Sequence, residues 1–514
     1  MQLLSRAARR LEQFPDSPAW FERHLGSPVR QALVLLLVGL ALRIATFGDP
    51  NLHVDEAWYF LVGHEMHHGA IPYVTIWDRK PVGLFLLYYL FAGISTSVLA
   101  YQIPALLFAS ATAWVIARIA ARLTGAQGAV LAGASYLLML GPLEGFGGQT
   151  PVFYNLLIAG AAWLVLQSLD ALDAGRPGWR MVAAMALAGT ALTFKQTTMF
   201  EAAFLGLFAA WRLWRSPAPR RLTCLWVALW IAVGAAPTLA CAAWYSGAGY
   251  WSEYWQAMYY SNVRKSSTQP LELVLNISRF VLATYPLWGL YLLSLLASEE
   301  KNKKTIATRF CTLWIASSMC GIAIIPNFYV HYAIPIVSPF LLYISLIFDR
   351  RDIGFFCFTF VLLFTMVLFN PANRLDRKSS IESTHAMVRD IAANRTRGGL
   401  FVFDGPSYVY AIAEERPPGR LVFPYHFSQG DERNVSHIDT AAETRRILRN
   451  KPEFVMLAPF DITYPSNVET RQMVETYVFS RCTLLDTQLM YDIYETTLIG
   501  LWGKCKDGPG YIDY

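Results

Sequence analysis

The sequence predicts a polytopic all-α membrane protein that carries a small α/β domain at its C-terminal end. Of its 514 residues, 54% are hydrophobic and only 16% are charged, whereas soluble domains carry about 25% charged residues. Several apolar runs approach the roughly 20 helical residues that cross about 30 Å of hydrocarbon. After Phe369 the composition turns polar within a few residues, and no further run of that length follows.

The apolar runs predict about eleven transmembrane helices. The seven clearest runs are residues 32–47, 151–169, 224–245, 277–297, 310–325, 332–348 and 353–369. Four fainter runs, rich in Ala and Gly, are residues 102–121, 129–141, 181–194 and 197–211.

Residues 81–98 are also apolar, but the distribution of positive charge argues against a span there. If this segment lies along the outer surface, fourteen cations of the later loops face the cytoplasm and five face outward. The fourteen are Arg118, Arg122, Arg176, Arg180, Arg212, Arg215, Arg220, Arg221, Lys301, Lys303, Lys304, Arg309, Arg350 and Arg351, and the five are Arg79, Lys80, Lys195, Arg264 and Lys265. A span at 81–98 would invert this bias, so we expect an interfacial helix.

The predicted spans and the distribution of positive charge together predict the domain organisation. Residues 1–29 form a cytoplasmic tail without a signal-peptide pattern, residues 30–370 form the membrane body, and residues 48–101 are its first external loop. Residues 371–514 form an external α/β domain, with strands expected at 400–403, 421–423 and 454–457 and helices at 381–394, 440–450 and 468–478. Cys482 and Cys505 of this domain either pair in an oxidising compartment or stay free.

The first external loop begins with His53-Val54-Asp55-Glu56-Ala57-Trp58, which places two adjacent carboxylates at the membrane surface. The topology brings other polar residues to the same side. Besides Asp55 and Glu56 these are Asp78, Arg79, Lys80, Gln149, Lys195, His331 and Tyr332, with Arg43 near the outer end of the first span. Ionisable groups at this depth usually face a cavity and serve a ligand.

The charges of these residues indicate the kind of ligand. Arg and Lys hold phosphate oxygens, and paired carboxylates bind or deprotonate sugar hydroxyls. A phosphate and a sugar at the lipid boundary describe a polyprenyl-phosphate-linked sugar donor. The net charge of +6 is small for this length, and no nucleic acid partner is expected. Without a phosphate-binding or dinucleotide-binding glycine motif, no nucleotide cofactor is expected either.

Here the chain resembles a family. Asp55-Glu56-Ala57, then Ile71-Pro72-Tyr73, then Trp77-Asp78-Arg79-Lys80-Pro81 are similar to the first external loop of the C-type (GT-C) membrane glycosyltransferases, in particular the protein O-mannosyltransferase and lipid A aminoarabinose transferase groups. Phe194-Lys195-Gln196 and His331-Tyr332-Ala333-Ile334-Pro335 are similar to motifs of bacterial members. The resemblance covers residues 30–370.

The resemblance implies a glycosyltransferase that moves a sugar from a polyprenyl-phosphate donor to an external acceptor by one inverting displacement. Asp55 is expected to be the base, and Glu56 to orient the sugar or acceptor. Lys80 is expected to bind the donor phosphate. The remaining roles implied are phosphate binding by Arg79, Lys195, His331 and Arg43, and sugar or acceptor binding by Asp78, Gln149 and Tyr332.

The second external loop has Gly147-Gly148-Gln149-Thr150 where many relatives carry an acid, so no metal is expected. The expected acceptor is an envelope glycolipid, lipopolysaccharide or polysaccharide, and the expected location is a bacterial inner membrane with the site on the periplasmic side. Two other functions stay open, a protein O-mannosyltransferase-like enzyme and a lipid-linked sugar transporter or flippase. Simpler roles also remain, because an Asp can cap a helix and a Lys can anchor an interfacial helix.

Overall fold

The structure is a computed structural model that describes residues 18–264, 269–297, 305–325, 327–369, 378–463, 465–491 and 496–506. The predicted cytoplasmic tail up to residue 17, the domain boundary at 370–371 and the loop cations Lys265, Lys301, Lys303 and Lys304 lie outside the described residues. The chain divides into two compact units. We call Met1–Ala45, Ile103–Cys241 and Pro270–Pro371 the helical unit, and Thr46–Gln102, Ala242–Gln269 and Ala372–Tyr514 the α/β unit.

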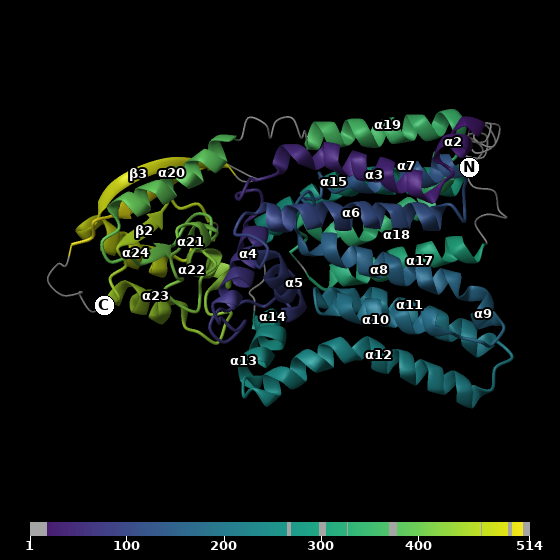
Figure 1. Cartoon of the computed structure of the whole chain (residues 1–514), viewed down its shortest axis with the longest axis horizontal. Helices are drawn as coiled ribbons and strands as arrows, with labels where there is room; N and C mark the ends of the chain where they lie inside the picture. Colours follow the sequence, from purple (N-terminus) through teal and green to yellow (C-terminus); the bar gives the residue numbers. More distant parts are fainter. Residues whose placement is uncertain are drawn as a thin grey trace. The chain divides into compact units, whose positions relative to one another are not determined.

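The helical unit consists of helices, most of which are long and apolar (Figure 1). They are α2 (Ala19–Leu25), α3 (Pro28–Arg43), α6 (Leu99–Ala120), α7 (Ala126–Met139), α8 (Thr150–Gln167), α9 (Leu169–Asp173), α10 (Trp179–Leu192), α11 (Met199–Arg215), α12 (Arg220–Gly247), α15 (Pro270–Ala297), α17 (Ile306–Ala323), α18 (Ile334–Phe348) and α19 (Arg351–Leu368), with α6 and α12 lying mostly in this unit. Helices suit a membrane because they satisfy all their backbone groups internally.

Burial separates central from peripheral helices. The span that contains α18, Val330–Phe348, is 89% buried within the protein, whereas α12 is only 6% buried. Helix α18 packs against α7, α15, α17 and α19. A helix that is apolar all round is either a buried core helix or one that faces lipid, so α18 forms the centre of this unit and α12 offers its apolar surface to the bilayer.

Eight helices of the described residues are long and apolar enough to cross a membrane. They include all seven of the clearest predicted spans and one fainter run, as α6. The other three fainter runs correspond to α7, α10 and α11, which have 14, 14 and 17 residues. The chain is an integral membrane protein, and a count of eleven spans stays a prediction.

The α/β unit contains several of the segments that the charge distribution places outside. From the first external loop it takes α4 (Val54–His67) and α5 (Val82–Ala92), and from a later loop α13 (Trp251–Trp255) and α14 (Ser261–Arg264). The 11 residues of α5 extend about 16 Å at 1.5 Å per residue. This helix is therefore too short to cross the bilayer alone, in agreement with its prediction as a helix that does not span.

The C-terminal part of this unit is a mixed four-stranded sheet with helices around it (Figure 1). The strands are β1 (Leu400–Val402), β2 (Phe454–Leu457), β3 (Thr483–Tyr491) and β4 (Thr496–Gly503), in the order β1-β2-β4-β3. The helices are α20 (Lys378–Asn394), α21 (Val409–Ile412), α22 (Tyr425–Ser428), α23 (Thr440–Arg449) and α24 (Val468–Arg481). Strands β1 and β2 are parallel, and β4 is antiparallel to both β2 and β3.

The predicted α/β class is confirmed, but one predicted strand is wrong. Residues 421–423 form no strand, although Leu421 and Val422 are buried. At the preceding residue, the carbonyl of Arg420 accepts from the N–H of Trp77 at 2.8 Å, and its own N–H donates to Glu443 at 2.8 Å. The backbone leading into this segment is thus bonded outside the sheet, and its apolar side chains fill the core from a loop.

Trp77, from the first external loop, belongs to the hydrophobic core of the C-terminal sheet. It is 1% exposed and lies in one cluster with Phe401, Phe427 and Val455. Burying an aromatic side chain of this size stabilises by several kcal/mol, because Trp→Ala changes in cores cost about 3–5 kcal/mol. The motif that follows Trp77 is therefore fixed to the C-terminal part of the unit.

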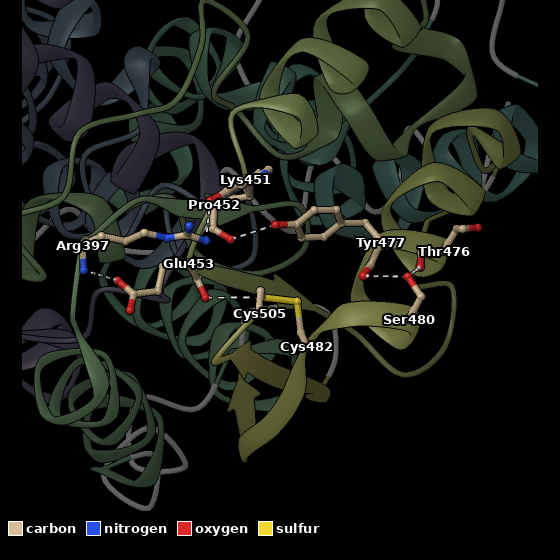
Figure 2. Close-up of a disulfide and its surroundings, with 9 residues drawn as sticks. All are labelled: Arg397, Lys451, Pro452, Glu453, Thr476, Tyr477, Ser480, Cys482 and Cys505. Carbon is tan, nitrogen blue, oxygen red and sulfur yellow. Dashed lines mark hydrogen bonds between the residues drawn. A yellow bond between two sulfur atoms is a disulfide. The ribbon is translucent and has the colours of Figure 1, made fainter. Parts of the chain in front are cut away.

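Cys482 and Cys505 form a disulfide, which decides the open question from the sequence (Figure 2). Cys482 precedes β3 and Cys505 follows β4, so the bond closes the open end of the β3–β4 hairpin next to the register pair Thr483 and Gly503. The other five cysteines are free.

Candidate active site

Asp55 and Glu56 lie in the first turn of α4, where the N-terminal end of the helix favours negative charge. The side chain of the N-cap residue His53 accepts the N–H of Asp55 through Nδ1 at 3.1 Å. Glu56 is fully buried, while the side chain of Asp55 is 21% exposed. Of the two carboxylates, Asp55 is thus the one that a substrate can reach.

Lys80 and Tyr59 converge on the same oxygen of Asp55. The Nζ of Lys80 lies 3.7 Å from Asp55 Oδ2, and the hydroxyl of Tyr59 donates to that oxygen at 3.0 Å. Lys80 also sits over the Tyr59 ring, 5.4 Å from its centroid. The side chain of Lys80 is 20% exposed, so a flexible cation and a carboxylate share one accessible position.

Asp78 fixes the loop that carries Lys80. Its Oδ1 accepts the backbone N–H groups of Arg79 and, at 2.7 Å, of Lys80, and its Oδ2 accepts the indole N–H of Trp58. Asp78 is 6% exposed. These three donors tie the Lys80 loop to α4, one turn from Asp55.

Tyr73, of the Pro-Tyr pair, supports the other side of this loop. Its backbone φ is 71°, an uncommon value for a residue with a side chain, and its hydroxyl donates to the carbonyl of Lys80 at 2.7 Å. Strained backbone of this kind persists where surrounding contacts enforce it, often at functional sites. The carbonyl of the preceding Pro72 accepts from Tyr245 at 3.2 Å.

Arg79 points to the C-terminal part of the unit. Its two terminal nitrogens donate to the two carboxylate oxygens of Glu432 at 2.7 and 2.6 Å. The side chains are 22% and 5% exposed. Together with the buried Trp77, this bidentate pair fixes Trp77-Asp78-Arg79-Lys80 from both sides.

A second polar group lies within the helical unit. Arg43, 2% exposed, donates to the carbonyl of Gly145 at 2.5 Å. The neighbouring Glu144, whose φ is 60°, lies 3.0 Å from Nδ1 of His331. The ring of His331 is 4.7 Å from that of Tyr332, and Lys195 sits over the Tyr332 ring at 4.6 Å from its centroid.

The ten predicted site residues therefore occupy two places. Asp55, Glu56, Asp78, Arg79 and Lys80 all belong to the α/β unit. Arg43, Gln149, Lys195, His331 and Tyr332 all belong to the helical unit. Gln149 is 1% exposed and is the N-cap residue of α8.

No protein-family model matches the sequence, and no curated protein is significantly similar to it. The structure is similar to ArnT from Cupriavidus metallidurans in the apo state, with 12% identity over 91% of this chain and 97% of the other and a TM-score of 0.60. It is also similar to ArnT from the same organism bound to undecaprenyl phosphate, with 12% identity, 92% and 97% coverage and a TM-score of 0.56.

The chain has the C-type glycosyltransferase fold. At 12% identity the likeness concerns the fold, and it extends over almost the whole chain. The sequence resemblance, which rested on short motifs between residues 53 and 335, is thereby confirmed at the level of architecture.

Several contacts in this C-type fold were not predicted from the sequence. Tyr59, four residues after Asp55, could have been found from helical spacing, because residues i and i+4 share a face. Glu144 lies just before the Gly147-Gly148-Gln149-Thr150 motif, and its contact with His331 spans 187 residues, a separation that local sequence patterns do not reveal. Nothing in the sequence links Glu432 to Arg79, 353 residues away.

Glu201 of α11 is a further buried carboxylate in the helical unit of this fold. It is 3% exposed and accepts the indole N–H of Trp314 at 2.7 Å and the hydroxyl of Ser318 at 3.0 Å. It lines a small cavity of about 20 Å³ together with Lys195 and Tyr332. A carboxylate within the predicted span 197–211 was the available signal, because such residues are rare unless functional.

An apolar groove of about 620 Å³ runs between α11 and α17. Phe200, Phe204 and Leu313 are among its lining residues. On the same two helices, Glu201 and Ser318 line the cavity that contains Lys195. Polar and apolar binding surfaces thus adjoin along α11 and α17 of the helical unit.

Proposed function

We propose that this protein is a membrane glycosyltransferase that moves a sugar from a polyprenyl-phosphate donor to an acceptor outside the cytoplasm. The observation that carries the proposal is the contact between Asp55 and Lys80. A carboxylate and a cation 3.7 Å apart, both reachable, offer one group for the acceptor proton and one for the donor phosphate. The C-type fold, shared with an ArnT structure bound to undecaprenyl phosphate, supports this assignment.

The reaction is a single displacement at the anomeric carbon. Asp55 takes the proton of the acceptor hydroxyl while the oxygen of that hydroxyl attacks the anomeric carbon. The bond from the anomeric carbon to the phosphate oxygen breaks at the same time. The polyprenyl phosphate leaves with the bonding electrons, and the anomeric configuration inverts. A positioned base of this kind accelerates transfer about 10²- to 10⁴-fold.

Lys80 changes partner during the cycle. In the structure its Nζ lies 3.7 Å from Asp55 Oδ2. When the donor phosphate arrives, the flexible Lys side chain turns to the phosphate oxygens, and Asp55 is left to accept the proton of the acceptor hydroxyl. Tyr59, which keeps its hydrogen bond to Asp55, holds the carboxylate in place meanwhile.

The other predicted residues divide into two roles. In the helical unit, Lys195, His331 and Arg43 supply positive charge of the kind that stabilises a phosphate, and the groove between α11 and α17 suits an apolar prenyl chain. Arg79 and Asp78 are positioning residues, since Glu432, Trp58 and the loop backbone already occupy their polar atoms. Tyr332 orients the sugar or acceptor, and the buried Glu56 and Gln149 act as positioning residues behind the surface that the substrate reaches.

We also propose where the site lies. Three of the segments that the positive-inside rule places outside, namely the first external loop, the loop that contains Arg264 and the C-terminal domain, belong to one unit. We assign that unit to the periplasmic side of a bacterial inner membrane, with an envelope glycolipid or glycan as acceptor. A protein acceptor is the alternative. Protease accessibility of a tag after Tyr514 from the periplasm supports the assignment, and a cytosolic tag contradicts it.

The experiment uses the full chain in lipid nanodiscs with a labelled polyprenyl-phosphate sugar and an extract of envelope acceptors. We expect release of free polyprenyl phosphate, a labelled acceptor that mass spectrometry identifies as glycan, lipid or protein, and an inverted anomeric configuration by NMR. A product with retained configuration, or transfer of the phosphate along with the sugar, would contradict the mechanism. Movement of intact donor across a bilayer without cleavage would instead indicate a flippase.

A further inference from the structure

A small cavity within the α/β unit lies outside the Asp55–Lys80 contact. Its volume is about 70 Å³, and its walls come from the segment before α4, from α4 itself, from the loop after β1 and from the β3–β4 hairpin. One water needs only about 10–15 Å³ measured in this way. The cavity therefore holds more than a single solvent molecule.

Asp404 brings an unsatisfied acceptor to this cavity. It follows β1 and is 1% exposed. Its Oδ2 accepts the backbone N–H of Ala458 at 3.0 Å and Nη1 of Arg471 at 3.2 Å. Its Oδ1 is buried and has no hydrogen-bond partner among the residues that the structure describes.

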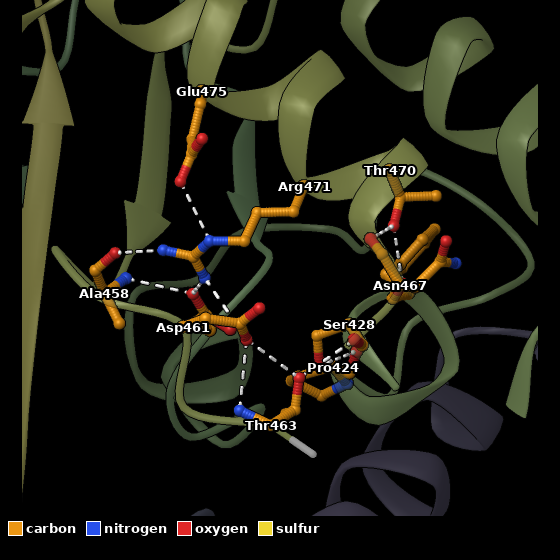
Figure 3. Close-up of polar contacts among 11 residues, drawn as sticks. Pro424, Ser428, Ala458, Asp461, Thr463, Asn467, Thr470, Arg471 and Glu475 are labelled. Atoms are coloured by element: carbon orange, nitrogen blue, oxygen red, sulfur yellow. Dashed lines mark hydrogen bonds and ion pairs between the residues drawn. The ribbon is translucent and has the colours of Figure 1, made fainter. Parts of the chain in front are cut away.

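Arg471 is held firmly, so it cannot turn to satisfy the second oxygen. Its Nη2 donates to the carbonyl of Ala458 at 2.8 Å and its Nε to Glu475 at 2.8 Å, and Asp461 lies 4.0 Å from Nη1 (Figure 3). One guanidinium thus serves three carboxylates. The excess negative charge leaves Asp404 Oδ1 as an acceptor for a donor from outside this network.

Asn51 provides a second acceptor on the same cavity, from the first external loop. Its side chain is 7% exposed, and its amide nitrogen contacts the Ser380 hydroxyl at 2.7 Å and the Thr384 hydroxyl at 2.8 Å. The donor contacts fix the orientation of the amide, and Oδ1 is left without a partner in the described part of the chain. A buried acceptor without a donor is unfavourable, so both oxygens favour a ligand that donates hydrogen bonds.

The position within the fold is also typical of a ligand site. The loop after β1 and the residue after β2 lie at the carboxyl ends of two parallel strands, where open α/β sheets bind their ligands. The remaining walls are mainly apolar, with Phe423, Pro424 and Ile499 among them. Apolar walls with a few polar groups that converge on one point are the usual composition of a small-molecule site.

We propose that this cavity is a saccharide subsite, in which two hydroxyl groups of one sugar unit donate to Asp404 Oδ1 and Asn51 Oδ1. Sugar hydroxyls supply the donors that both oxygens lack, and the carbon-bound faces of the ring meet the apolar walls. Val54 and Ala57 of α4 line the cavity on either side of the Asp55-Glu56 pair in sequence. The sugar unit accordingly belongs to the acceptor, an assignment that rests on the proposed glycosyltransferase function.

The test measures binding of methyl glycosides of the common hexoses and pentoses to the full chain in nanodiscs by saturation-transfer NMR. Thr497→Phe places a large ring in the cavity from a half-buried position of β4. Thr487→Phe, on an exposed position of the neighbouring β3, is the matched control. We expect at least about a tenfold loss of affinity in Thr497→Phe and Asp404→Asn, and unchanged affinity in Thr487→Phe.

The outcomes separate the subsite from the proposed function. Absence of glycoside binding to the wild type, binding that Thr497→Phe leaves unchanged, or a cavity that an experimental map shows filled by water in the presence of glycoside overturns the subsite. If donor hydrolysis by water is slowed in Thr497→Phe, the sugar is the donor's and the acceptor assignment is overturned. Glycoside binding with the expected variant pattern but no transferase activity leaves the subsite standing while the proposed function fails.

Discussion

The ion pair between Arg79 and Glu432 gives a quantitative test of how the Lys80 loop is held in place. The change Arg79→Ala removes both hydrogen bonds, at 2.7 and 2.6 Å, and takes the Arg79 guanidinium away from the Glu432 carboxylate, which is 5% exposed. Loss of one partner of a buried pair costs about 3–5 kcal/mol, and exposed pairs contribute about 0–1 kcal/mol. With Arg79 22% exposed, we expect about 2 kcal/mol.

Amide hydrogen exchange of the full chain measures this loss of stability in the loop itself. A loss of about 2 kcal/mol raises exchange about 30-fold in peptides that cover residues 71–81, because 1.4 kcal/mol corresponds to a factor of ten. Arg433→Ala is the control, since its pair with Glu469 has side chains that are 52% and 37% exposed. If both variants change the exchange rate equally, or if Arg79→Ala leaves residues 71–81 as protected as in the wild type, then the Arg79–Glu432 pair does not hold this loop.

Three further predictions concern the α/β unit. Cys482→Ala removes a disulfide between residues that are 23 positions apart and should lower the free energy of unfolding by about 3 kcal/mol. The denaturation midpoint should fall and should no longer shift with reductant. An unchanged midpoint would show that the bond does not stabilise the unit. Burial raises the pKa of Asp404 from 3.8 to about 6. The charged carboxylate therefore lowers the free energy of unfolding by up to about 3 kcal/mol, and this penalty is absent below pH 4 and complete above pH 6. Asp404→Asn should accordingly be more stable relative to the wild type at pH 7 than at pH 4. A stability difference that does not change with pH would contradict the raised pKa. Tyr59→Phe removes one hydrogen bond to Asp55 and should lower transfer about tenfold at unchanged donor binding; equal loss of both would point to a folding defect.

The sequence predicted the parts of this fold that depend on local composition. Long apolar runs identify spans because lipid requires them, and the Lys80 loop was found from its motif. Strands β1 and β2 are short buried runs, and they were predicted. The β3–β4 hairpin was missed because many of its residues are half exposed and Gly500 and Gly503 interrupt its apolar pattern.

Long-range partners could not be predicted in the same way. Arg79 was expected at the donor phosphate, and its sequence context says nothing of Glu432, which binds it in the structure. Residues 421–423 have the composition of a strand, yet the backbone beside them bonds to Trp77 from the first external loop. Hydrogen-bonding partners such as these depend on tertiary structure, which periodicity does not encode.

The transfer rate of Asp55→Asn decides whether Asp55 is the catalytic base. Asn keeps the shape of Asp55 but cannot accept the acceptor proton, so we expect kcat to fall about 10²- to 10⁴-fold, with unchanged binding of polyprenyl phosphate to the full chain in nanodiscs. Asp352→Asn is the matched control, because its side chain is 71% exposed at the start of α19. A rate for Asp55→Asn equal to that of Asp352→Asn would contradict the account.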